Sequence, residues 1–263
     1  MIKLIATDMD GTLLTDEGKF APDFFDVLKQ LNEKDIKFVA ASGRSCYSLK
    51  KVFSPHDREI FYISDNGGFL NYENNSEVIH PMTSSQVFST VEACLGIDKL
   101  QIILCAKDRA YFLNPDREHL SSINYYYTDY EIINDYKNLN EQILKVALYD
   151  PFGSSENAYP KIKDKLDKSL RAVVSSVNWI DIMNKDLNKG TALKRMQNIL
   201  GITKDETMAF GDFNNDIEML KCAKYSFAMQ NAAEQVKEYA NYIADTNNNY
   251  GVVKAIKQFV LDK

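Results

Sequence analysis

Polar side chains gather directly after three short apolar segments of the sequence. After the first segment comes Asp8-Met9-Asp10-Gly11-Thr12, after the second Ser42-Gly43-Arg44, and after the third Gly211-Asp212-Phe213-Asn214-Asn215-Asp216. Four of these side chains are carboxylates, the groups with which enzymes bind divalent cations, attack electrophiles and transfer protons. The spacing predicts a chemical site, provided that the three segments lie side by side.

Such carboxylates require a cation if they converge. Two carboxylates about 4 Å apart repel each other by about 4 kcal/mol even at an effective dielectric constant of about 20. An all-oxygen cluster suits hard Mg²⁺, which favours one or two carboxylates together with substrate phosphate. His and Cys are absent from the three segments, which argues against zinc, copper and iron. Mg²⁺ is therefore the predicted cofactor.

The elements around these segments are expected to form an open parallel sheet. Short apolar runs alternate with amphipathic stretches over most of the chain, which favours a doubly wound α/β core with helices on both faces. In such sheets ligands bind in the crevice outside the carboxyl ends of the strands. Lys189, just before a predicted helix, can join the carboxylates there from the side. We expect core strands at 2–7, 36–41, 60–64, 207–210, 225–229 and 242–244, a hairpin within 67–80, and helices at 23–33, 46–53, 190–200, 216–223, 232–240 and 251–260.

The middle of the chain has a different pattern. Predicted strands there follow one another as neighbours, which indicates an α+β module inserted into the parallel core. The module is expected to span 83–184, so that 1–82 and 185–263 form the core. We expect strands at 102–106, 111–114, 143–149 and 172–183, and helices at 85–95 and 158–170.

Composition narrows the choice of partners. Lys and Arg number 31 against 37 Asp and Glu, a formal net charge of −6, so nucleic acid and anionic membrane surfaces are poor partners. The longest stretch without a charged residue, 78–91, falls short of the ~20 apolar residues of a membrane span. The four cysteines contain no C-x-x-C pair, and the segment before Asp8 is too short to be the apolar region of a secretory signal. We expect a cytoplasmic protein with reduced thiols, either a monomer or a small homo-oligomer.

The motifs resemble those of the haloacid dehalogenase-like hydrolases, and more narrowly those of the Cof-type phosphatases. The resemblance spans the chain and rests on Asp8-Met9-Asp10-Gly11-Thr12-Leu13-Leu14, Ser42-Gly43-Arg44, Asn66-Gly67, Lys189-Gly190 and Gly211-Asp212-x-Asn214-Asn215-Asp216. Met9 stands where the family usually has Leu, and Phe213 where it often has Asn, but neither position supplies the chemistry. The resemblance implies that 83–184 is an α/β cap that sets substrate specificity over a catalytic core.

The resemblance also assigns roles, and elementary chemistry agrees with them. Asp8 would attack phosphorus and form an aspartyl phosphate, while Asp10 would protonate the leaving oxygen and then activate water. The metal ligands would be Asp8, Asp10 through its main-chain carbonyl, Asp212 and Asp216. Phosphate would be bound by Ser42, the Gly43 N–H, Lys189 and Asn215, supported by Thr12, Arg44 and Asn66.

The expected activity is Mg²⁺-dependent hydrolysis of a small phosphorylated metabolite, a sugar phosphate or a similar polyol ester. One alternative is a phosphomutase, which would isomerise its substrate instead of releasing phosphate. Another is a binding module that senses Mg²⁺ and phosphate at the Asp8 cluster without turnover. Tyr125, Tyr126 and Tyr127 either form an aromatic wall over a sugar or serve as ordinary strand and core residues.

Overall fold

The computed structural model describes residues 1–124 and 126–262 and divides the chain into two compact units. The first unit comprises Met1–Ser42, Phe53–Glu77 and the chain from Asn188 onward, and the second comprises Gly43–Val52 and Val78–Leu187. The predicted insert, 83–184, lies within the second unit. That unit also takes in the segment 43–52, which sequence reasoning had placed in the core.

An eight-stranded sheet forms the centre of the first unit, in the order β14-β13-β12-β1-β2-β3-β4-β5. Its strands are β1 (Leu4–Thr7), β2 (Lys37–Ala41), β3 (Phe61–Ser64), β4 (Phe69–Tyr72), β5 (Asn75–Val78), β12 (Thr207–Gly211), β13 (Tyr225–Met229) and β14 (Tyr242–Ala244). The strands from β14 to β3 pair in parallel, and β4 turns back antiparallel to β3. The predicted doubly wound parallel core is confirmed, and the predicted hairpin within 67–80 is β4 and β5.

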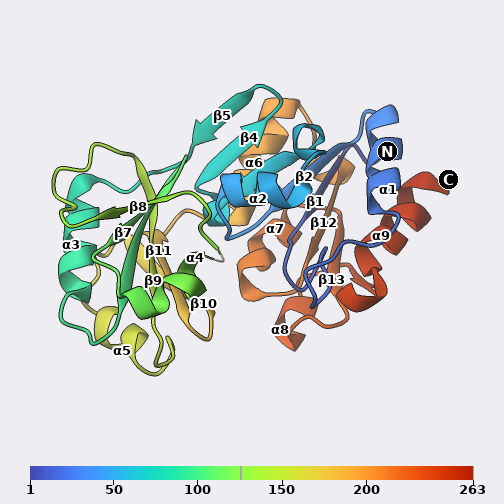
Figure 1. The fold of residues 1–263 in the computed structure, drawn as a ribbon. Coiled ribbons are helices and arrows are strands. Elements are labelled where there is room, and N and C mark those ends of the chain that lie inside the picture. Colours follow the sequence, from blue (N-terminus) through green and yellow to red (C-terminus); the bar gives the residue numbers. More distant parts are fainter. Residues whose placement is uncertain (125, 263) are drawn as a thin grey trace. The chain divides into compact units, whose positions relative to one another are not determined.

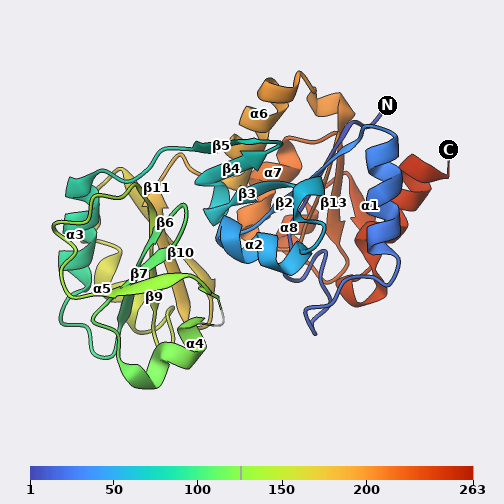
Figure 2. The same cartoon turned by 45° about the horizontal axis from the view of Figure 1, so that its top comes forward.

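Helices lie on both faces of this sheet, with α1 and α9 on one face and α6 and α7 on the other (Figures 1 and 2). Their bounds are α1 (Phe24–Glu33), α6 (Lys189–Leu200), α7 (Ile217–Lys221), α8 (Glu234–Lys237) and α9 (Gly251–Ile256). The residues of β1 are buried throughout because both faces of the central strands are covered. The helix predicted over 232–240 is shorter than expected: α8 has four residues, and Ala233, which precedes it, donates its N–H to the Asp212 carbonyl (3.2 Å).

A six-stranded sheet, in the order β10-β11-β9-β6-β7-β8, forms the second unit. Its strands are β6 (Gln101–Ala106), β7 (Ala110–Leu113), β8 (Tyr130–Ile133), β9 (Ile143–Tyr149), β10 (Leu170–Ser176) and β11 (Trp179–Asn184), and the helices of this part of the chain are α2 (Cys46–Phe53), α3 (Ser84–Cys94), α4 (Leu120–Asn124) and α5 (Ala158–Ile162). Within the described residues of this sheet, β7 and β8 pair in parallel and the other pairs are antiparallel. The predicted α+β character of the insert is thus observed.

Two elements of the insert differ from the prediction. The expected strand 172–183 is a hairpin of β10 and β11, turning at Val177-Asn178. This turn has no Gly or Pro and is held from outside, because the Asn178 amide donates to the Asp150 carbonyl (2.7 Å). The expected helix 158–170 ends at Ile162, since the following seven residues contain Leu166 as their only apolar side chain and offer little surface to bury.

The consecutive tyrosines at 125–127 do not share one environment. Tyr127 is buried in an apolar cluster with Phe112 and Trp179, so it is a core residue. Tyr126 is 39% exposed and packs edge-on against the Trp179 ring. Tyr125 lies outside the described residues.

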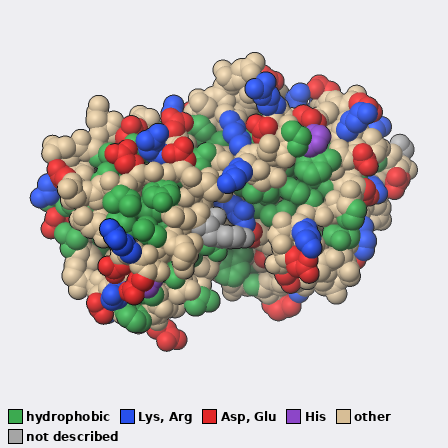
Figure 3. Space-filling view, viewed as in Figure 1, with side chains coloured by type: hydrophobic (Ala, Val, Ile, Leu, Met, Phe, Trp, Pro, Cys, Tyr) green, Lys and Arg blue, Asp and Glu red, His purple; other side chains and the backbone are tan. Residues whose placement is uncertain are grey.

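The charged side chains, the cysteines and the lengths of the helices can be compared with the expectations from composition. Charged side chains of both signs are interspersed over the face in Figure 3. All four cysteines are buried as thiols and not as disulfides. In the part of the chain that the structure describes, no helix combines the length and apolar character needed to cross a membrane.

Candidate active site

Three carboxylates meet at the carboxyl end of the central strands. Asp8 follows β1 and Asp212 follows β12, and the Asp8 N–H extends the ladder between these strands by donating to the Phe210 carbonyl (3.1 Å). Oxygens of Asp8, Asp212 and Asp216 all lie within 4.8 Å of one another. The Asp10 side chain is exposed and is not one of this group. The sequence therefore predicted where the cluster forms, and three of the four expected carboxylates share it.

The loop after β1 packs against Asp212. Gly11 has φ +75°, and a Cβ atom there would stand 2.5 Å from the Asp212 Oδ2 atom, so this position requires glycine. Thr12 donates its hydroxyl to Asp212 Oδ1 (2.7 Å). Thr12, which the sequence predicts as a supporting residue, thus bridges the first and last motifs.

Asp216 organises the last motif as well as contributing to the cluster. Its Oδ2 accepts hydrogen bonds from the main-chain N–H groups of Asp212 and Phe213, each at 3.1 Å. Its Oδ1 lies 2.7 Å from Lys189 Nζ. Asp216 therefore fixes the backbone that presents Asp212, in addition to any contact with a metal.

Lys189 enters the cluster from the start of α6. Asn188 caps this helix by accepting from the Thr191 N–H (2.8 Å), and Lys189 is the first helical residue. Its ammonium, which is not exposed, lies 2.5 Å from Asp8 Oδ1 and 2.7 Å from Asp216 Oδ1. A Cβ on Gly190 would stand 2.3 Å from the Glu218 carbonyl oxygen, so α6 and α7 approach closely there. This approach carries Lys189 into the site.

Burial and like charges shift the pKa values of the cluster. Burial raises the pKa of Asp8 well above its ordinary value; Lys189 opposes the shift, and Asp216, Asp212 and Asp10 add to it. Burial also raises the pKa of Asp212 to about 6, although the Thr12 hydrogen bond works against this. For Lys189, burial lowers the pKa, but Asp216 and Asp8 outweigh it and the net shift is upward. Lys189 therefore stays charged.

The donor set fits a divalent cation. Three carboxylates against one ammonium leave a formal charge of −2, and every candidate ligand atom is an oxygen. Hard, oxygen-seeking Mg²⁺ matches both features. Asp8, Asp212 and Asp216 are the residues that could hold it, with the Asp10 carbonyl as the fourth predicted ligand.

Ser42, Asn66 and Asn215 are linked by hydrogen bonds. Ser42 is buried after β2, its N–H donates to the Ile63 carbonyl (2.8 Å), and its carbonyl accepts from the Asn66 N–H (3.0 Å). Asn66, with φ 55°, accepts through Oδ1 from the Asn215 amide (3.1 Å). Gly43 and Arg44 belong to the second unit, where the Gly43 carbonyl accepts a hydrogen bond from Lys145 (2.9 Å).

Two asparagines that sequence reasoning missed also contact the loop after Asp8. Asn231 donates to the Gly11 carbonyl (2.8 Å), and buried Asn247 donates to the Leu14 carbonyl (3.0 Å). Both lie more than two hundred residues from their partners. Nothing in the local sequence marks such a contact; the Asn247-Asn248-Asn249 run is the one visible signal.

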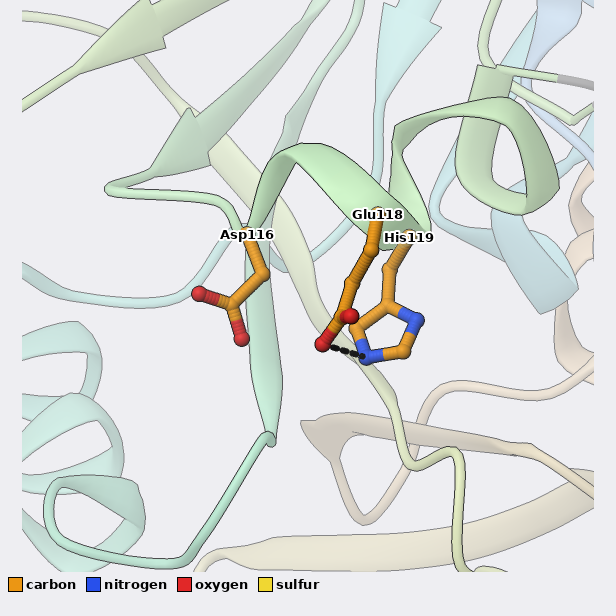
Figure 4. Close-up of side chains that lie close together, drawn as sticks. All are labelled: Asp116, Glu118 and His119. Atoms are coloured by element: carbon orange, nitrogen blue, oxygen red, sulfur yellow. Dashed lines mark ion pairs between the residues drawn. The ribbon is translucent and has the colours of Figure 1, made fainter.

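A second group of potential ligands lies in the second unit. Figure 4 shows Glu118 and His119 joined by an ion pair (3.4 Å), with Asp116 beside them. The Lys99 ammonium already lies 2.8 Å from Glu118 and 3.8 Å from Asp116. Lys99 thus offsets part of the negative charge of this group, whose Glu118 is exposed, and the Asp8 cluster, in which Asp8 and Asp216 are buried, is the better metal site.

Comparisons with known proteins agree with one another. The model of a family described as haloacid dehalogenase-like hydrolase matches residues 5–256. The chain is 34% identical over 262 residues to the 5-amino-6-(5-phospho-D-ribitylamino)uracil phosphatase of Escherichia coli, covering 97% of this chain and 95% of that protein. It is 26% identical over 296 residues to a phosphatase of Bacillus subtilis, covering 98% and 100%. A crystal structure of a Streptococcus mutans protein, 32% identical, superposes with a TM-score of 0.88 and coverages of 99% and 100%.

Proposed function

Since this chain belongs to the haloacid dehalogenase-like hydrolases, we propose that it is a phosphomonoesterase that hydrolyses a small phosphorylated metabolite through an aspartyl phosphate. One observation carries the proposal. Asp8, at the end of the central strand, has the buried Lys189 ammonium 2.5 Å from its carboxylate. The nucleophile and the positive charge needed for a phosphoryl group thus lie together.

In the first step, a carboxylate oxygen of Asp8 attacks phosphorus and the bond from phosphorus to the leaving oxygen breaks. Asp10, exposed beside the cluster, gives its proton to that oxygen. Lys189, with Ser42 and the Gly43 N–H, stabilises the charge on the equatorial phosphoryl oxygens. Asn215 and Arg44 are further candidates for contact with substrate.

In the second step, Asp10, now ionised, takes a proton from water as the water oxygen attacks phosphorus. The acyl phosphate bond breaks, phosphate leaves, and the Asp8 carboxylate is regenerated. Mg²⁺ bound by Asp8, Asp212, Asp216 and the Asp10 carbonyl would supply positive charge toward the phosphoryl oxygens. Thr12 and Asn66 hold the loops that present these groups.

The proposed substrate is the phosphate ester of a sugar or another polyol. The E. coli relative is named for a substrate whose phosphate is carried on a ribityl chain, which is such a polyol. We assign selectivity to the inserted segment 83–184 and chemistry to 1–82 and 185–263. The carboxylate cluster and Lys189 all come from the first unit, which supports this division.

The test is a phosphate-release screen over a few dozen phosphorylated metabolites, with and without Mg²⁺. We expect wild-type protein with Mg²⁺ to release phosphate from sugar or polyol esters, and excess chelator to stop the release. Product analysis should show free phosphate and dephosphorylated alcohol. An isomerised phosphate ester would indicate a mutase, and a stoichiometric phosphoenzyme without turnover would indicate a sensing module.

A further inference from the structure

A side chain outside the carboxylate cluster holds the loop that carries Asp10. Asn231 follows β13, and its Nδ2 donates to the Gly11 carbonyl oxygen at 2.8 Å. Its Oδ1 accepts from the main-chain N–H of Asn247 at 3.0 Å. Because a carbonyl only accepts and an N–H only donates, these two partners fix the orientation of the amide.

The far end of the same loop is held in a similar way. Asn247, which is buried, donates through Nδ2 to the Leu14 carbonyl (3.0 Å) and to Asp16 Oδ1 (2.9 Å). Since Asn231 binds the Asn247 backbone, the two asparagines form one bracket across the segment 11–16. The bracket joins the loop to chain that lies after β13 and β14.

Gly11 is the place where the loop most needs an outside contact. It has no side chain, and its φ of +75° lies in a region that other residues rarely adopt. The carboxylate of Asp212 occupies the space where a Cβ would be. Gly11 directly follows Asp10. The Asn231 hydrogen bond therefore restrains the loop at a position where no side chain can do so.

The segment around Asn231 also contacts the loop that carries Asp212. Ala233, two residues further on, donates its N–H to the Asp212 carbonyl (3.2 Å). One short stretch after β13 therefore touches both loops that face each other across the cluster. A change at Asn231 would loosen the side of this arrangement that carries Asp10, while the Ala233 contact to Asp212 is a main-chain bond and remains.

We propose that Asn231 is a positioning residue for proton transfer by Asp10. It holds the Gly11 peptide so that the neighbouring carboxyl reaches the leaving oxygen. The inference rests on the proposed function. A displacement of about 1 Å at a catalytic group can cost about a hundredfold in rate. The loss should fall on the steps that need the Asp10 proton.

The test compares two leaving groups in the full-length protein with saturating Mg²⁺. An aryl phosphate leaves as a stabilised phenolate and needs little protonation, whereas an alkyl phosphate from the release screen needs it. For N231A we expect kcat/KM on the alkyl ester to fall about 10- to 100-fold. On the aryl ester kcat/KM should stay within about threefold of wild type, because it reports phosphoenzyme formation alone. Dephosphorylation should slow and give a burst of phenolate.

Asn241 provides a matched control. Its side-chain amide also donates to a main-chain carbonyl at 2.8 Å, that of Lys224, and it is likewise exposed in the first unit. N241A should therefore keep the wild-type ratio of alkyl to aryl kcat/KM. N231D covers the case in which N231A fails to fold, because it keeps the shape and the acceptor for Asn247 but cannot donate to Gly11.

D10N is the reference for the expected signature. The inference is overturned if D10N is selective for the aryl ester while N231A and N231D lose activity equally on both esters. It is also overturned if N241A shifts the ratio as much as N231A does. Failure of the proposed function looks different: wild-type protein would hydrolyse neither ester, or D10N would lose both equally.

Discussion

At the scale of single residues, the site consists of carboxylates and an ammonium group that are largely buried together. Asp8 and Asp216 share the Lys189 ammonium, and Asp212 adds a third carboxylate. Burial and repulsion raise the pKa values of Asp8 and Asp212, so ionised carboxylates are costly there without a metal. The arrangement favours binding of a divalent cation over stability of the metal-free protein.

Asp8→Asn should affect turnover and stability in opposite ways. We expect turnover to fall by more than about a thousandfold, since an amide is not a nucleophile toward phosphorus. Because the fold disfavours the charged form of Asp8, a neutral, nearly isosteric side chain should leave the metal-free melting temperature equal to or above that of wild type. Phosphate release and thermal denaturation measure the two effects. A variant within tenfold of wild-type activity would remove Asp8 from the role of nucleophile.

At the scale of elements, short contacts between neighbouring segments decide where side chains stand. The carboxylate of Glu206 lies 2.6 Å from Lys3 and accepts from the Thr203 N–H (3.0 Å), which ties the start of β12 to the chain just before β1. The approach of α6 to α7 at Gly190 carries Lys189 to Asp8. The Glu206 contact predicts a pH dependence of stability, and the Gly190 contact predicts the effect of a substitution.

Glu206 should give the protein a measurable pH dependence. Lys3 and the Thr203 hydrogen bonds lower the pKa of Glu206 to about 2 in the folded chain, from an ordinary value of 4.5. A lowered folded pKa means that the stabilisation is complete above pH 4.5 and is lost as the pH falls toward 2. E206Q should therefore melt below wild type at pH 7, and the gap should narrow steadily between pH 4.5 and 2.5. A gap that stays constant over this range would contradict the prediction.

Gly190→Ala tests the close approach of the two helices. Alanine is intrinsically favoured over glycine within a helix by about 1 kcal/mol. Here the new Cβ would meet the Glu218 main chain, so overpacking should win and lower the free energy of unfolding by about 1–3 kcal/mol. Lys189, the preceding residue, should shift too and reduce kcat. K194A, at an exposed position of the same helix, is the control and should change the stability by less than about 0.5 kcal/mol.

The sequence predicts the features that depend on residues close together in the chain, and it does not predict those that depend on distant partners. The parallel core was predictable because strands buried on both faces read as apolar runs, and Asp8 and Asp212 follow those runs directly. The β10–β11 turn was not predictable, since it is held by Asp150 from another part of the unit. The contact of Asn231 was not predictable for the same reason, because its partner, Gly11, is 220 residues away.

At the scale of the whole molecule, Mg²⁺ should act as a stabilising ligand whose effect depends on pH. In the metal-free protein, the raised pKa values mean that the folded state holds more protons than the unfolded chain between about pH 4 and 6, so stability falls as the pH rises. Mg²⁺ competes with those protons. The melting temperature should thus rise more on addition of Mg²⁺ at pH 7.5 than at pH 5.

The magnitude and control follow from mass action. At a Mg²⁺ concentration of about 100 Kd the gain should be about 2.7 kcal/mol. D212N removes one carboxylate of the cluster and should lose most of the shift at pH 7.5. A shift as large at pH 5 as at pH 7.5, or one that D212N retains, would place the metal elsewhere.

The pairing of β1 with β12 also constrains the synthesis of the chain. Leu4 pairs with both Lys37 and Thr207, so the strand that precedes Asp8 has one neighbour close to it in the sequence and another about two hundred residues later. On a ribosome adding about 5–20 residues per second, β12 follows β1 by roughly 10–40 s. During that interval β1 is an apolar edge strand, open to pairing with other nascent chains. Chains released before Thr207 should therefore aggregate, and a chaperone that shields this edge should raise the yield of the complete protein.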